Sequence, residues 1–96
     1  MTRERSAVLS ALVKKGFQLK EGDHDFLILH DAQGRKATVN TKLSRGTGHR
    51  EIGDSLLGLM ARQCHLPKSD FIRLIDCGLS GEAYLQKLID ADLVDP

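Results

Sequence analysis

The chain has 96 residues, enough for one domain with one modest hydrophobic core. Apolar residues make up 41% and charged residues 28%, which is the balance of a globular protein and excludes an intrinsically disordered one. No apolar run is long enough to cross a bilayer, and residues 1–10 are too charged for a secretory signal. We therefore expect a cytoplasmic protein with no membrane partner.

The net charge of +1 conceals an uneven distribution of charge along the chain. Residues 32–50 contain no Asp or Glu, and their basic residues are Arg35, Lys36, Lys42, Arg45 and Arg50. Residues 76–96 are acidic, with Lys87 as their single basic residue. An anionic ligand would meet the basic middle of the chain. Ordinary surface charge on a solvated loop explains the same pattern, and charge alone favours that simpler interpretation.

Residues 3–15 are predicted to form a helix, because apolar residues recur four positions apart within them. Thr2 is placed to cap the start of this helix. Gly16 is placed to end it, since a residue in the left-handed conformation at that point is most often glycine. The sequence therefore begins with one amphipathic helix of about three turns.

Three strands are predicted after this helix. They are expected at residues 17–20, 25–30 and 35–40. Gly22 is expected to turn the chain between the first two strands by adopting a positive φ. The sequence "DAQG" is a hairpin loop of the usual length between the second and third strands, and alternation places Ala37 and Val39 on one face.

The second half of the sequence predicts a loop and three helices. Residues 41–49 are polar, basic and contain two glycines, which predicts the loop. Residues 50–64 follow as a helix, whose expected apolar stripe is Ile52, Leu56, Leu57, Leu59, Met60 and Cys64. Two short helices come last, because "LPKSDFI" at 66–72 is echoed by "LSGEAYL" at 79–85, with Gly78 between them. Pro67 suits a first helical position and Ser80 an N-cap.

This order of elements indicates an α+β fold. We expect a three-stranded antiparallel sheet covered on one face by helices 3–15 and 50–64. Residues 1–77 would form the helix-strand-strand-strand-helix domain. Residues 78–96 would be a C-terminal helical extension packed on the same domain.

The strand at 25–30 is apolar on both faces, with Phe26 and Ile28 on one and Leu27 and Leu29 on the other. The Phe26/Ile28 face therefore needs a cover, which could be a partner chain, including a second copy that makes a homodimer. The helix near 81–91 could also lie there, with its acidic flank masking the basic residues at 42–50 as RNA would. The simpler interpretation is that residues 66–91 extend the core beside the helix at 50–64.

The sequence predicts no metal site and no other cofactor. His49, Cys64, His65 and Cys77 can ligate zinc, but no CxxC or HxxxH pair is present to organise a site. The two cysteines lie among helical apolar residues and are expected to be reduced core thiols. The serines lack a Gly-x-Ser-x-Gly context, so a serine nucleophile is not expected.

His24 is the most unusual residue of the chain. It stands between Asp23 and Asp25, after Gly22, at the start of a strand predicted to be buried. A histidine titrates near neutral pH, and RNA carries its own nucleophile in the 2′-hydroxyl, so one imidazole with nearby positive charge suits metal-free RNA cleavage. The two aspartates would favour the imidazolium form and would repel phosphate. A hydrogen-bonded residue at a strand edge remains an equal alternative on these grounds.

The segment ending in "KKGF" and continuing as "GDHDFLILHDAQGRKATV" resembles the HicA, or YcfA-like, family of small bacterial toxins, and "LPKSDFI" resembles a Leu-Ser-x-x-x-Phe element of that family. The resemblance covers roughly residues 7–75. It implies a fold similar to the double-stranded-RNA-binding domain and an activity as an mRNA interferase, a ribonuclease (endonuclease, hydrolase) of a type II toxin-antitoxin system. It also implies a HicB-like antitoxin as a protein partner.

His24 lies where the family has the histidine of its Gly-Ser-His motif, so the resemblance implies that His24 is catalytic. Lys36, Lys42, Arg45 and Arg50 would hold RNA phosphates, with Gly22, Asp23 and Asp25 in supporting positions. The chain departs from the family in having aspartate on both sides of this histidine, a longer loop at 41–49 and the added residues 78–96. A catalytically damped or inactive module that binds RNA or protein therefore remains the alternative function.

Overall fold

The computed structural model describes residues 2–22, 24–31, 33–44 and 51–94. In chain order, its elements are β1 (Arg3–Glu4), α1 (Arg5–Lys14), β2 (Phe17–Glu21), β3 (His24–His30), β4 (Lys36–Ser44), β5 (Glu51–Ile52), α2 (Asp54–Gln63), α3 (Lys68–Ile75) and α4 (Gly81–Asp90). The predicted α+β class with a three-stranded antiparallel sheet is confirmed. Within the described residues, no helix has the length and apolar character needed to cross a membrane.

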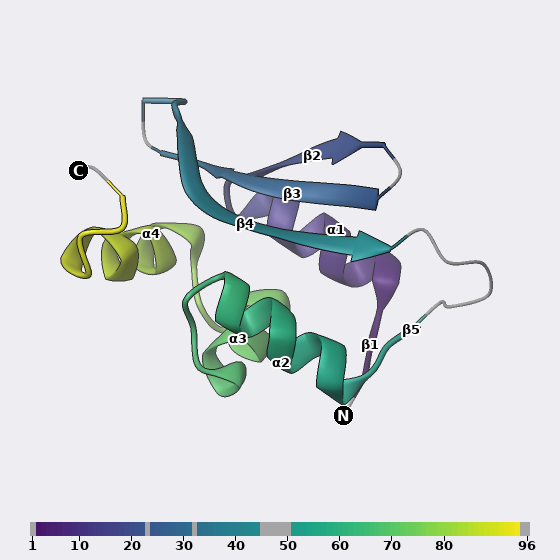
Figure 1. Ribbon diagram of the computed structural model, residues 1–96. Helices are drawn as coiled ribbons and strands as arrows, with labels where there is room; N and C mark the ends of the chain where they lie inside the picture. The colour runs from purple at the N-terminus through teal and green to yellow at the C-terminus, as the bar shows by residue number, and fades with distance from the viewer. Residues whose placement is uncertain (1, 23, 32, 45–50, 95–96) are drawn as a thin grey trace.

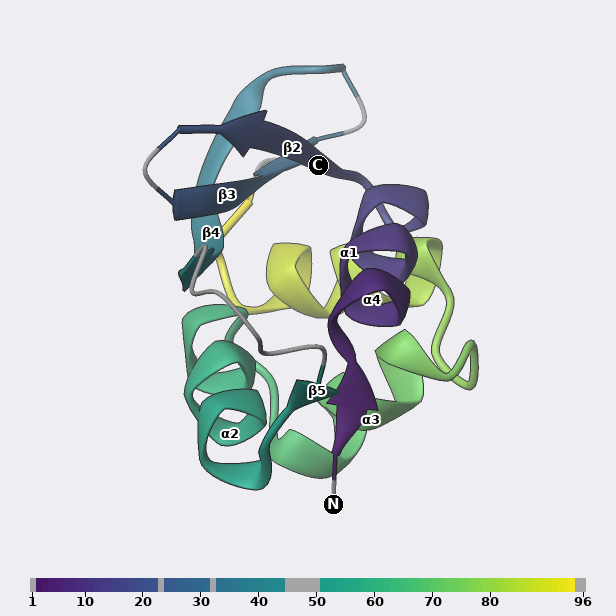
Figure 2. The same cartoon turned by 90° about the vertical axis from the view of Figure 1, so that its right-hand side faces the viewer.

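The three-stranded sheet has the order β2-β3-β4, with both neighbouring pairs antiparallel. The helices lie together on one side of this sheet, as the two views of the ribbon show (Figure 1, Figure 2). The short strands β1 and β5 form a separate antiparallel pair near the N-terminus. The sheet therefore has one face packed on helices and one face turned away from them, which we call the open face.

The turn between β3 and β4 is held by one aspartate. The Asp31 carboxylate accepts hydrogen bonds from the backbone N–H groups of Gln33 and Arg35 at 2.9 and 2.8 Å. Gly34 adopts φ +79°, a conformation that an L side chain rarely tolerates. The predicted hairpin loop is confirmed, and it fixes which residues of β3 and β4 lie opposite one another.

The helix face of the sheet and the four helices enclose one hydrophobic core. Tyr84 of α4 illustrates how the last helix joins it. Its ring stacks on Phe17 of β2, with ring centroids 6.0 Å apart, and its hydroxyl donates to the Cys64 carbonyl at 2.8 Å. The largest side chains that are fully buried in this core are Tyr84, Phe71, Leu12, Leu27, Leu29, Leu43, Leu57, Met60, Leu74 and Leu88.

The position of α4 decides between the two roles considered for the C-terminal residues. Tyr84 and Leu88 are buried in the shared core on the helix side of the sheet. The idea that this helix covers the Phe26/Ile28 face is therefore wrong, and residues 66–91 extend the core instead. Ser80 caps α4 as predicted, because its hydroxyl accepts a hydrogen bond from the Ala83 N–H at 3.1 Å.

The N-terminal helix begins later than expected. Residues Arg3 and Glu4 form β1, which pairs with β5, and α1 starts at Arg5. Thr2 is not the N-cap, since its hydroxyl donates to the Glu51 carboxylate at 2.9 Å across that pair. The sequence pattern missed this pairing because its two strands are nearly 50 residues apart. Gly16 ends the helical segment with φ +108°, as predicted.

Two boundaries in the middle of the chain also differ from the prediction. Residues 41–44 belong to β4 and not to a loop, because Thr41 and Leu43 alternate inward and are buried. Helix α2 starts at Asp54, after Gly53 as its N-cap residue, because the two residues before Gly53 pair with β1. Residues 45–50 lie outside the described part of the chain.

Three side chains predicted to be in the core are exposed. Leu56 and Leu59 are 37% and 49% exposed, so the buried stripe of α2 is narrower than the sequence suggested. Cys64 is buried as expected, but Cys77 is exposed, since it follows the end of α3 in a tight turn with φ 67°. Among the described glycines, Gly22 is not one of those with positive φ, so its expected turn conformation was wrong.

Candidate nucleic-acid interface on the open face of the sheet

The open face is defined by the alternation of β3. Asp25, Leu27 and Leu29 are buried against the helices, whereas the residues between them are half-buried. The half-buried set on the open face is His24, Phe26, Ile28 and His30. The predicted parity is confirmed, because His24 shares a face with Phe26 and Ile28.

The neighbouring strands surround these residues with polar and basic side chains. Phe26 lies opposite Lys20 of β2 and Lys42 of β4, so two lysines flank one aromatic ring. Ile28 lies in the same way between Gln18 and Asn40. Lysines beside a half-buried aromatic ring are suited to a nucleic-acid strand, because the accessible part of the ring can stack on a base while the ammonium groups meet phosphates.

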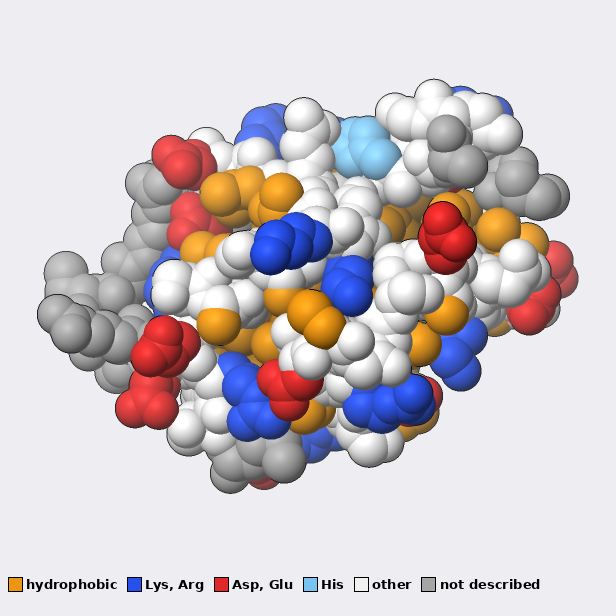
Figure 3. Space-filling model, turned by 180° about the vertical axis from the view of Figure 1, so that it is seen from behind, with side chains coloured by type: hydrophobic (Ala, Val, Ile, Leu, Met, Phe, Trp, Pro, Cys, Tyr) orange, Lys and Arg blue, Asp and Glu red, His pale blue; other side chains and the backbone are white. Residues whose placement is uncertain are grey.

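The open face lacks acidic side chains within the described residues of the sheet. The two carboxylates of β2, β3 and β4 are those of Glu21 and Asp25, which lie opposite each other in the register and have the parity of the helix side. By contrast, the view from behind shows basic, acidic and hydrophobic side chains mixed over the surface (Figure 3). The lysines of the described sheet residues thus lie on the open face, and its two carboxylates lie on the helix side.

His24 begins β3 and lies opposite Ser44 at the end of β4. Its ring meets the Phe26 ring edge-on, with centroids 6.2 Å apart. The Nδ1 atom is buried, and no described residue forms a hydrogen bond with it. A role in proton transfer would therefore fall to the other ring nitrogen, Nε2.

Asp25 follows His24 in the sequence but lies on the other face of the sheet. Its side chain turns to the helix side, where the carboxylate forms an ion pair with the Arg5 guanidinium at 2.6 Å. Adjacent strand residues point to opposite faces, so the Asp25 carboxylate does not share the open face with His24. Asp23 lies outside the described residues.

The other predicted site residues are divided between the two ends of the open face. Lys42 lies near the His24 end, whereas Lys36 lies opposite His30 at the far end of β3. The two histidines lie six positions apart along β3, a distance of about 20 Å. Arg45 and Arg50 fall outside the described residues. Gly22 is not needed for close packing, because a side chain there would make only an ordinary contact with the His24 carbonyl.

Sequence reasoning missed Lys20 and His30, which also belong to the open face. Both could have been found from the alternation of the strands. Phe17 and Leu19 point inward, so Lys20 must point outward, and the hairpin turn brings His30 next to Lys36. The basic set of the open face is larger than the predicted one by these two residues.

The described residues contain no cluster of three metal-ligating side chains. Cys64 is unsuited to bind a metal or to act as a nucleophile, because burial raises the pKa of its thiol to about 12. Compared with protein-family models, with curated proteins and with solved structures, the chain gives no match.

Proposed function

We propose that this protein is a HicA-like ribonuclease toxin that cleaves mRNA without a metal, with His24 as its acid/base. The observation that carries the proposal is that His24 lies on the open face, among lysines and without a carboxylate beside it in the described residues of the sheet. The side chain that would have opposed RNA binding, Asp25, is paired with Arg5 on the other side. The resemblance of residues 7–75 to the HicA family supports the same function.

The proposed chemistry uses the RNA as its own nucleophile. The ribose 2′-oxygen attacks the adjacent phosphorus, and the bond from phosphorus to the 5′-oxygen of the next nucleotide breaks. His24 Nε2 accepts the 2′-hydroxyl proton and, as the resulting imidazolium, gives it to the departing 5′-oxygen. Lys42 stabilises the negative charge that develops on the phosphate. The products are a 2′,3′-cyclic phosphate and a 5′-hydroxyl end.

The same proposal includes the arrangement and partners that the family implies. The helix-strand-strand-strand-helix order would form an arrangement similar to the double-stranded-RNA-binding domain. The protein would act as a toxin in the bacterial cytoplasm. A HicB-like antitoxin would neutralise the toxin, and the open face is the surface it would need to occlude. The half-buried Phe26 and Ile28 give that surface an apolar centre, which a protein partner or a second copy of the chain could cover.

The test is induced expression of the wild-type chain and His24→Ala in a bacterium, with Lys87→Gln as a matched surface control. We expect the wild type and the control to slow growth and degrade mRNA, and His24→Ala to do neither. Fragments should carry 2′,3′-cyclic phosphate ends. Equal and harmless expression of all three proteins, with intact mRNA, would refute cleavage.

A second function is favoured by one feature of the site, the lack of any described partner for His24 Nδ1. A catalytic imidazole is normally oriented through its second nitrogen, so an unoriented ring suits binding better than catalysis. The alternative is therefore a module that binds RNA through the open face without cutting it. Incubation of purified protein with RNA in the presence of a chelator separates the two, because retention of intact RNA indicates binding alone. An absence of both retention and cleavage would instead indicate a protein-interaction role.

A further inference from the structure

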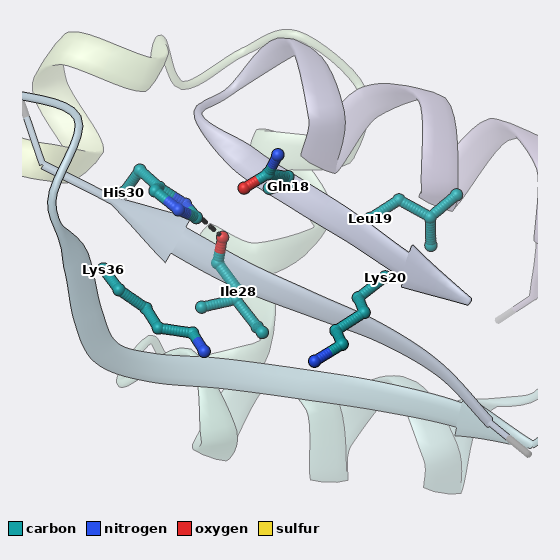
Figure 4. A pocket seen from close by; sticks show the side chains of 6 residues that line it. All are labelled: Gln18, Leu19, Lys20, Ile28, His30 and Lys36. Carbon is teal, nitrogen blue, oxygen red and sulfur yellow. Dashed lines mark hydrogen bonds between the residues drawn. The ribbon is translucent and has the colours of Figure 1, made fainter. Parts of the chain in front are cut away.

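The open face carries a pocket around Ile28, four positions along β3 from His24. Its volume is about 190 Å³, and it is lined by Gln18, Leu19, Lys20, Ile28, His30 and Lys36. The pocket takes residues from all three strands of the sheet (Figure 4). It is therefore a product of the strand register and not of a single loop.

Two lysines converge on this pocket from the outer strands. Figure 4 shows Lys20 on β2 and Lys36 on β4, with their ammonium groups extending toward the space around Ile28 on the central strand. No Asp or Glu lines the pocket, and neither lysine forms an ion pair with a described carboxylate. Two ammonium groups at such a site repel each other, and a bound anion would relieve that repulsion.

His30 is held in one orientation at the wall of the pocket. Its Nδ1 lies 3.0 Å from the Ile28 carbonyl oxygen (Figure 4). A carbonyl oxygen can only accept, so Nδ1 is the donor and carries a proton. Nε2 is then the nitrogen left for a ligand. It would donate to a phosphate oxygen as the imidazolium, and accept from a ribose hydroxyl when neutral.

From these three features we infer that the pocket is a second subsite for RNA, which holds one phosphate and its ribose beside Ile28, about 13 Å along β3 from His24. Lys20 and Lys36 bind the phosphate, and His30 contacts the same nucleotide through Nε2. Ile28 forms the apolar floor. This subsite rests on the proposed function for its ligand, an RNA strand that runs along β3. It adds a contact that would hold the strand in register while His24 acts elsewhere on it.

The phosphate contact is tested with inorganic phosphate and the purified full chain, using backbone amide NMR. We expect the His30 and Lys36 amides to shift together and to saturate as phosphate is added. Lys36→Gln should abolish the shift at His30, while Lys87→Gln, which removes the same charge from α4, should leave it unchanged. An absence of saturable shifts in the wild type, or an unchanged response in Lys36→Gln, overturns the inference. Thermal melts of both variants confirm that they are folded.

The RNA contact is tested by the affinity of a single-stranded RNA oligonucleotide and of the DNA of the same sequence. All variants are made in a His24→Ala background so that the RNA stays intact. Lys36→Gln should weaken binding of both strands by roughly twofold to fivefold, as for one exposed charge pair. His30→Gln should weaken RNA more than DNA, because only RNA offers the 2′-hydroxyl. Equal affinities for Lys36→Gln, His30→Gln and Lys87→Gln with both strands overturn the subsite.

The two proposals can fail separately. Cleavage of RNA by the wild type, together with variants of this pocket that behave as the Lys87→Gln control, would remove the subsite and leave the toxin function intact. Saturable phosphate binding at His30 and Lys36 in a protein that never cleaves RNA would keep the subsite and remove the catalytic function.

Discussion

Arg5 and Asp25 form an ion pair of 2.6 Å that joins the first turn of α1 to the start of β3. This pair holds the Asp25 carboxylate on the helix side of the sheet, where strand alternation places it. The Asp25 side chain is largely buried, and so is much of Arg5, which is 23% exposed. The negative charge next to His24 in the sequence is therefore placed in the structure between helix and sheet.

Removing this pair should lower stability. Asp25→Ala leaves a half-buried guanidinium without that carboxylate, so we expect the free energy of unfolding to fall by about 1–3 kcal/mol. Urea denaturation followed by circular dichroism measures this change. Glu51→Gln, at an exposed position, is the comparison and should change it less. An Asp25→Ala protein as stable as the wild type would show that the pair contributes nothing.

Tyr84→Phe and Tyr84→Ala should separate the two contributions of this residue. Loss of the hydroxyl alone leaves the Cys64 carbonyl without that hydrogen bond, which costs about 1–3 kcal/mol. Loss of the ring removes a fully buried side chain that stacks on Phe17, which costs about 3–5 kcal/mol. Chemical denaturation of both variants gives the two values. Equal and small losses would place α4 outside the cooperative core, contrary to its packing.

The two cysteines should react very differently with iodoacetamide under native conditions at neutral pH. Cys77 is exposed, whereas Cys64 is buried and its thiol has a pKa raised to about 12, chiefly by desolvation. Mass spectrometry of digests should find alkylation at Cys77 and none at Cys64 until the protein unfolds. Rapid modification of Cys64 in the native protein would contradict the packing around α2 and α4.

The raised pKa of Cys64 also predicts a loss of stability at high pH. The folded state favours the protonated thiol, so this contribution is complete below the ordinary thiol pKa of 9.0 and is lost as pH rises from there toward about 12. Urea unfolding of the wild type and of Cys64→Ala between pH 7 and pH 11 measures this loss. We expect the free energy of unfolding to fall less above pH 9 in Cys64→Ala than in the wild type. Below pH 9 the free energy of unfolding should depend on pH in the same way in both proteins.

Asp31 should make the β3–β4 turn sensitive to acid. Its pKa is lowered, first by the hydrogen bond from the Arg35 backbone N–H and also by that of Gln33 and by the Arg35 charge. A lowered pKa means stabilisation that is present above the ordinary carboxyl value of 3.8 and is lost as pH falls through the folded-state value. Asp31→Ala should therefore flatten the acid limb of the stability curve below about pH 4. Titration of unfolding midpoints shows the difference, and parallel acid limbs would argue against it.

RNA binding should depend on salt in proportion to the lysines of the open face. Each phosphate contact to a single strand contributes about 0.7 to the slope of log affinity against log salt. Lys42→Gln and Lys20→Gln should each reduce the magnitude of that slope by about this amount, while Lys87→Gln should not. Fluorescence anisotropy over a salt series measures the slopes. Identical slopes for all three variants would show that the RNA site does not lie on the open face.

The local features of this protein could be predicted from its amino-acid sequence. Alternation in "HDFLILH" placed His24, Phe26 and Ile28 on one face, and the turn chemistry of "DAQG" gave the hairpin. Ser80 was recognised as the N-cap of the last helix, and Gly16 as the end of the first. Each of these depends on residues within one or two turns or one strand, so periodicity and backbone preference were enough to predict them.

The contacts between those local elements could not be predicted from the sequence and depend on the packed fold. The pairing of Arg3–Glu4 with Glu51–Ile52, the ion pair between Arg5 and Asp25, and the burial of Tyr84 all join segments at least 20 residues apart. The convergence of Lys20 and Lys36 on the pocket beside His30 also depends on the register of three strands. Such contacts follow from how the helices pack on the sheet, and no short stretch of sequence specifies that packing.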